Sequence, residues 1–93
     1  MKKIEIVRIY LKESEHHVKE IFKVLKEGGI KHGVAFRAIE GEGASAHILS
    51  LSLDLPILLE FFDVPEKVQA VLPKIQEVAS EGHIIKLLGE QVS

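Results

Sequence analysis

The residues best suited to bind a charged ligand follow an apolar stretch near the middle of the chain. Arg37 precedes two glycines, Gly41 and Gly43. An arginine can hold a phosphate through two parallel hydrogen bonds, and the backbone amides of a glycine-containing turn can cradle an anion. Two plainer interpretations stay open. The glycines can simply supply a turn between two strands, and Arg37 can form an ion pair with Glu40 or Glu60.

Metal binding and catalysis have weaker support from the residues present. The chain has five histidines and no cysteine, which excludes thiolate metal sites, disulfides and thiol nucleophiles. His16 and His17 are adjacent, so on a helix they point in different directions, and the other histidines show no metal-binding spacing. The serines lack a nucleophile motif, and the absence of asparagine argues against acylphosphatase chemistry. We therefore predict no catalytic residue, no metal site, no cofactor and no enzymatic activity.

The composition limits the size and the partners of the protein. Ninety-three residues are enough for one domain, which we expect to span 1–93. A formal net charge of −2 argues against a nucleic-acid partner. The sequence has no apolar stretch of signal-peptide or membrane-span length, so we expect no membrane insertion and a cytoplasmic location.

The pattern of apolar residues predicts the elements that position Arg37 and the glycines. Alternation predicts strands at 4–11, 33–40, 55–62 and 84–88, with a loop from Gly41 to about Ser52. Helical spacing predicts a helix that ends at Gly28-Gly29 and another that begins at a capping box of Asp63 and Glu66. The resulting order is β-α-β-β-α-β, which is the α+β ferredoxin-like fold. It implies a four-stranded antiparallel sheet with both helices on one face.

The strands predicted for the middle of the sheet are apolar on both faces. Along 4–11 the two faces carry Ile4, Ile6 and Tyr10 on one side and Val7, Ile9 and Leu11 on the other. Helices cover only one face, and the other would expose a larger apolar patch than a monomer usually tolerates. We therefore expect this face to be buried against other copies of the chain.

Three segments resemble a known protein family. They are VRIYLKES at 7–14, RAIEGEG at 37–43 and LSLDLPILLE at 51–60. Together they are similar to an uncharacterised family of PII-like proteins, which are related in fold to the PII nitrogen-regulatory proteins and the CutA proteins. Where that family has Glu-Gly-Phe-Gly, this chain has a carboxylate at Glu42, and the stretch that follows Gly43 is shorter.

The resemblance implies a ligand site and an assembly. It implies a trimer with its sheets packed inward and an adenine nucleotide at the boundary between subunits. By position, the segment 80–83 is similar to a second phosphate-facing loop of PII proteins, with Lys86 as a counter-charge. The alternative, which we favour for Gly82, is a helix C-cap in a left-handed conformation.

These observations lead to one main prediction and one alternative. We predict a non-catalytic, PII-like signalling protein that forms a homotrimer and binds AMP, ADP, ATP or another small anion, with a possible protein partner at the 41–52 loop. The alternative is a CutA-like trimer with a metal-binding or structural role. The predicted ligand-binding residues are Arg37, Gly41, Gly43, Gly82 and Lys86.

Overall fold

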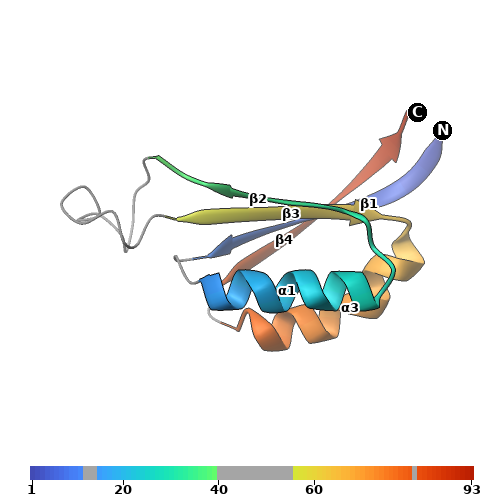
Figure 1. The fold of residues 1–93 in the computed structure, drawn as a ribbon. Coiled ribbons are helices and arrows are strands. Elements are labelled where there is room, and N and C mark those ends of the chain that lie inside the picture. Colours follow the sequence, from blue (N-terminus) through green and yellow to red (C-terminus); the bar gives the residue numbers. More distant parts are fainter. Residues whose placement is uncertain (12–14, 40–55, 81) are drawn as a thin grey trace.

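The computed structural model describes residues 1–11, 15–39, 56–80 and 82–93, and within them the predicted element order is confirmed (Figure 1). The predicted 41–52 loop, with Gly41 and Gly43, lies outside the described residues. The elements are β1 (Lys2–Leu11), α1 (Glu15–Glu27), β2 (His32–Arg37), β3 (Ile57–Asp63), α3 (Pro65–Val78) and β4 (His83–Gln91).

The sheet has the strand order β2-β3-β1-β4, and each neighbouring pair is antiparallel. The first and third strands therefore lie in the middle, as predicted. Both α1 and α3 pack on one face of the sheet (Figure 1). The fold is thus the predicted ferredoxin-like arrangement. Within the described part of the chain, none of the helices is long and apolar enough to cross a membrane.

The core lies between the helices and the sheet. On the helix-facing side, Val7 is opposite Phe61 and Ile9 is opposite Leu59 in the β1–β3 register, and all four side chains are fully buried. The helices contribute the apolar stripes that their spacing predicts, namely Ile21, Val24 and Leu25 from α1 and Val68, Val71 and Ile75 from α3.

The ends of the helices confirm one predicted cap and correct another. The N–H of Gly29 bonds to the carbonyl of Lys26 at 3.1 Å, and the N–H of Ile30 bonds to that of Leu25 at 2.9 Å. This is a Schellman cap, with Gly29 at φ 76°. The predicted capping box at Asp63 is wrong. Asp63 is still paired in β3, so α3 begins one residue later, with Val64 at the N-cap position and no side-chain cap.

The second face of the sheet confirms the expected exposed apolar surface. We call this surface the open face; it carries Ile6, Arg8 and Tyr10 of β1, Leu58, Glu60 and Phe62 of β3, Val34 and Phe36 of β2, and Ile85 and Leu87 of β4. Phe36 is 57% exposed and Val34 is 49% exposed in the single chain. In the centre of this face, Arg8 Nε donates a hydrogen bond to Glu60 Oε1 at 2.8 Å.

Candidate ligand site beside Arg37

A hollow of about 500 Å³ lies between the first turns of α1 and the end of β2. Its volume is within the range of small-molecule sites, roughly 300–1,000 Å³. The hollow is lined by Val18, Lys19, Ala35, Phe36, Arg37 and Ile57. It therefore contains one of the predicted ligand residues, Arg37, in a setting that mixes apolar walls with cationic side chains.

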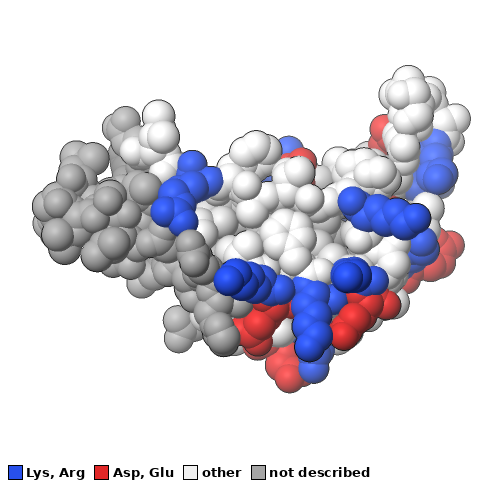
Figure 2. Space-filling view, viewed as in Figure 1, with Lys and Arg blue, Asp and Glu red and all other residues white. Residues whose placement is uncertain are grey.

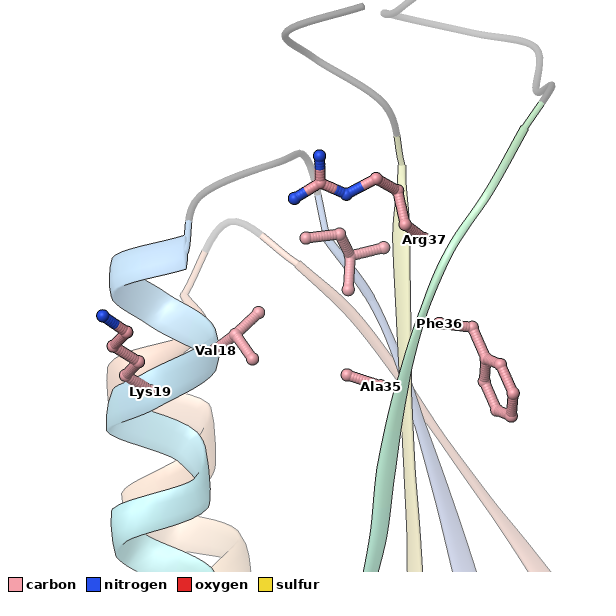
Figure 3. A pocket seen from close by; sticks show the side chains of 6 residues that line it. Val18, Lys19, Ala35, Phe36 and Arg37 are labelled. Atoms are coloured by element: carbon pink, nitrogen blue, oxygen red, sulfur yellow. The ribbon is translucent and has the colours of Figure 1, made fainter.

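The sheet register determines where the Arg37 side chain lies. Arg37 is the last residue of β2 and is paired with Ile57, whose side chain is buried against the helices. Arg37 therefore extends on the helix side of the sheet. Figure 3 shows Arg37, Val18 and Ala35 directed into the space between helix and strand, and Phe36 directed to the opposite face. The Arg37 side chain thus lines the hollow from the helix side of the sheet.

Glu60 takes part in a different interaction from the one considered for Arg37. It is opposite Val34 in the β2–β3 register, and its carboxylate is bound by Arg8 on the open face. Because side chains alternate along a strand, Arg37 and Glu60 extend on opposite faces of the sheet. Of the two carboxylates considered as partners, the structure therefore assigns Glu60 to Arg8, and Glu40 lies outside the described residues.

Gly82 lies at the same end of the sheet as Arg37, but its predicted conformation is wrong. The C-cap of α3 is Ala79, and Gly82 does not have a positive φ. Its N–H bonds to the Ala79 carbonyl at 2.9 Å. A Cβ at this position would lie 2.8 Å from Leu11 Cδ2 and 3.1 Å from the Tyr10 carbonyl oxygen. The requirement for glycine here comes from close contact with β1.

The strand order separates Gly82 from Arg37. Gly82 precedes β4, at one edge of the sheet, whereas Arg37 ends β2 at the other edge, with β3 and β1 between them. The structure therefore brings the two residues to one end of the molecule without placing them side by side.

Lys86 is engaged within the protein by a buried carboxylate. Its Nζ lies 3.3 Å from Glu5 Oε2, which also accepts a hydrogen bond from Gln69 Nε2 at 3.3 Å. Glu5 is only 4% exposed, and its Oε1 makes no hydrogen bond. A buried carboxylate without a partner is costly, so Lys86 has a clear structural role. Its predicted role as a counter-charge for a ligand would compete with this ion pair.

Three residues that matter for these sites were not singled out from the sequence. Val18 and Lys19 line the hollow, and their position on the first turns of α1 gave no indication of this. Glu5 did leave a signal, because alternation places it on the same face of 4–11 as Val7 and the other core residues. A carboxylate at a core position predicts a buried charged partner.

The described residues contain no cluster of side chains that could bind a metal ion. Across these parts of the chain, no group of three or more His, Cys, Asp or Glu side chains is arranged to hold an ion. His32 instead stacks on Phe62 of the open face, with ring centroids 4.7 Å apart.

The fold is shared with two classes of solved structure. CPII from Thiomonas intermedia K12, a nitrogen regulatory PII-like protein bound to ADP, AMP and bicarbonate, is 16% identical with a TM-score of 0.70, covering 96% of this chain and 90% of that one. The divalent ion tolerance protein CutA1 from Ehrlichia chaffeensis is 18% identical with a TM-score of 0.71, covering 100% and 87%. At this identity the likeness establishes the fold, which is the PII-like form of the ferredoxin-like fold.

The sequence identifies the family more narrowly. Residues 4–87 match the DUF190 family, described as "Uncharacterized ACR, COG1993". A UPF0166 protein of Methanocaldococcus jannaschii is 35% identical over 94 residues, which covers 91% of this chain and 87% of that protein. The chain belongs to the DUF190 family, and the predicted resemblance to an uncharacterised PII-like family is confirmed.

Proposed function

We propose that this chain, as one domain of residues 1–93, is a non-catalytic PII-like signalling protein. It assembles as a trimer through the open face, and it binds an adenine nucleotide or another small anion beside Arg37 at a subunit boundary. The observation that carries this proposal is the hollow at the end of β2, where an arginine is positioned over apolar walls. Apolar walls suit a base or a ribose, and a guanidinium suits a phosphate or a carboxylate.

The proposed assembly is supported by the composition of the open face. This face exposes aromatic and aliphatic side chains from all four strands, whereas the helix-covered face forms the core. Its one central charge pair, Arg8 with Glu60, is already matched within the chain. A surface of this kind is stabilised by burial against another apolar surface, and inward-facing sheets from three copies provide it.

The class of ligand is supported by the structural neighbour. CPII was crystallised with ADP, AMP and bicarbonate, which are anions that an arginine can hold through paired hydrogen bonds. In this chain Arg37 is followed by Gly41 and Gly43, whose backbone amides are available in the sequence for the same purpose. The role that we propose is to report the concentration of such a ligand to a partner protein.

Isothermal titration calorimetry with ATP, ADP, AMP and bicarbonate tests the ligand. We expect one of these to bind, and Arg37→Ala to weaken binding by about tenfold or more, equivalent to about 1.4 kcal/mol. Lys74→Ala is the matched control, because Lys74 is an exposed cation on α3 outside the hollow. Wild-type protein that binds none of the four ligands at millimolar concentration would refute this part of the proposal.

Absence of catalysis is tested separately. Incubation with ATP and Mg²⁺ should give no turnover above that of the Arg37→Ala variant purified in the same way. Hydrolysis that persists through purification and disappears in Arg37→Ala would contradict the non-catalytic role.

A further inference from the structure

A polar hollow lies at the opposite end of the sheet from Arg37. β3 ends at Asp63, opposite Glu5, whereas β1 and β4 continue to pair as far as Lys2 and Gln91 (Figure 1). The two longer strands therefore form a step above the start of α3. A hollow of about 220 Å³ lies at this step, and residues of all four strands, of α3 and of the turn after α1 line it. We call it the end hollow.

Three lysines from separate parts of the chain line the end hollow. Lys2 comes from β1, Lys31 from the turn between α1 and β2, and Lys67 from α3. All three are exposed, and across the described parts of the chain the structure gives none of them an ion pair. Figure 2 shows lysine or arginine side chains on the surface below the raised end of the molecule, where Figure 1 places both termini. Cations that share a hollow repel one another and attract an anion into it.

The carboxylate and the amide that line the end hollow are already engaged. Asp63 Oδ1 accepts a hydrogen bond from the N–H of Val64 at 2.7 Å. Gln91 Nε2 donates a hydrogen bond to the Ser93 carbonyl at 2.9 Å. Three lysines and one carboxylate leave the described lining with a formal charge of +2, in a chain whose net charge is −2.

A contact between α3 and the turn after α1 positions two of the lysines. Lys67 Nζ donates a hydrogen bond to the Gly29 carbonyl at 3.4 Å, and Lys31 follows two residues after that glycine. An ammonium group has three donors, so two remain on Lys67 for a ligand. At about 220 Å³ the end hollow is smaller than most small-molecule sites, roughly 300–1,000 Å³. It therefore suits a compact anion better than a nucleotide.

We propose that the end hollow binds a small, doubly charged oxyanion, such as inorganic phosphate or sulfate, between Lys2, Lys31 and Lys67. Lysines bind phosphate as point charges, and three of them surround such an anion from three elements of one chain. The site is separate from the one beside Arg37, because Lys31 precedes β2 and Arg37 ends it. The inference goes beyond the proposed function and does not depend on it.

The probe is inorganic phosphate, titrated at constant ionic strength into ¹⁵N-labelled Arg37→Ala protein, in which the other proposed anion site is removed. We expect the backbone amide signals of Gly29 and Lys67 to shift and to saturate at about millimolar phosphate, with no shift at Lys74 on α3. Sulfate should give the same pattern. Signals that do not saturate at about ten times that concentration, or shifts as large at Lys74, would overturn the proposal.

AMP distinguishes a free anion from the phosphate group of a larger molecule. In the Arg37→Ala protein we expect AMP to bind more weakly than phosphate, because the end hollow is too small for the nucleoside. Tighter binding of AMP, with shifts at the same amides, would show a nucleotide site and would overturn the assignment of a free anion.

Charge variants connect the affinity to the lysines. Lys31→Gln combined with Lys67→Gln should weaken phosphate binding by about tenfold or more, since two charged contacts are lost. Lys23→Gln combined with Lys74→Gln removes the same charge from exposed positions on α1 and α3 outside the end hollow, and should leave the affinity unchanged. Equal loss in both double variants would show an effect of net charge alone and would overturn the proposal.

A variant of the open face tests whether one chain is sufficient. Leu58→Asp places a charge on the open face, away from the end hollow, and should bind phosphate as the wild type does. Loss of binding in Leu58→Asp would place the anion between copies of the chain, and the assignment to the end hollow of one chain would be wrong.

Discussion

Leu58→Asp should dissociate the proposed trimer while leaving each chain folded. The β1–β3 register places Leu58 opposite Tyr10 and the β2–β3 register places it opposite Phe36, so it lies on the open face between two aromatic residues. The adjacent residue, Ile57, is 6% exposed and belongs to the core. The substitution therefore affects the surface that copies would share and spares the packing between the sheet and the helices.

The size of the effect can be worked out from the position of Leu58. Leu58 is already partly buried in one chain. Its further burial on association would therefore stabilise the trimer by only about 1 kcal/mol per subunit, and Leu58→Asp loses this contribution. Burial of an unpaired carboxylate costs several kcal/mol in addition, about 3 kcal/mol or more. Three subunits together therefore lose about 12 kcal/mol or more, which raises the dissociation constant by about eight orders of magnitude or more.

Light scattering measures the result directly. Wild-type protein should have about three times the 10.4 kDa chain mass, and Leu58→Asp should approach the mass of one chain with an unchanged helical spectrum. Gln76→Asp, on the exposed side of α3, should stay trimeric, and Ile57→Asp should unfold the chain. A wild-type monomer, or a Leu58→Asp trimer that resists dilution to micromolar concentration, would refute the assignment of the open face as the interface.

The remaining predictions concern stability, measured by urea denaturation. Gly82→Ala should lower the free energy of unfolding by about 1–3 kcal/mol through overpacking, since its Cβ would meet Leu11 and the β1 backbone. Gly29→Ala should cost about 1 kcal/mol, because φ is 76° there. Lys86→Met should cost about 1–3 kcal/mol by leaving the buried Glu5 carboxylate with fewer partners, and adding Glu5→Leu should restore much of the loss. Wild-type stability in any of the three single variants would contradict the contact on which it rests.

The fold was predictable because its main signals are local and repeated. Alternation along β1 separates Val7 and Ile9 from Ile6 and Tyr10, and the structure places the two sets on the faces that the alternation predicts. The spacing of apolar residues in the two helices likewise predicted which of their side chains lie in the core. The exposed apolar face was also predictable, because the two helices cover only one side of the sheet.

Features that depend on contacts between distant segments were harder to predict. The sequence predicts a left-handed cap at Gly82 because glycine after a helix usually adopts one, whereas the close contact with β1 is what requires glycine there. Asp63 looked like a cap because the pattern matched, but strand pairing with Glu5 holds it in β3. In both cases a neighbour far away in the sequence decided the outcome, and such a neighbour is not visible in a short motif.

The candidate site was predicted only in part for the same reason. Arg37 was chosen for its chemistry and its neighbours in sequence, and it does line a hollow. The residues opposite it, Val18 and Lys19, come from another element, and their approach depends on how α1 lies against β2. Lys86 was chosen by position, yet Glu5, far away in the sequence, engages it.

The pair of Arg8 and Glu60 determines how selective the open face can be. Each charge is matched by the other inside one chain, at 2.8 Å, so the face presents no net charge that a complementary chain would have to neutralise. Recognition through this face then depends on apolar burial and shape rather than on charge, and assembly should change little between low and high ionic strength. Related chains that keep the same pair could mix into hybrid assemblies with this one, unless the fit of their apolar side chains differs.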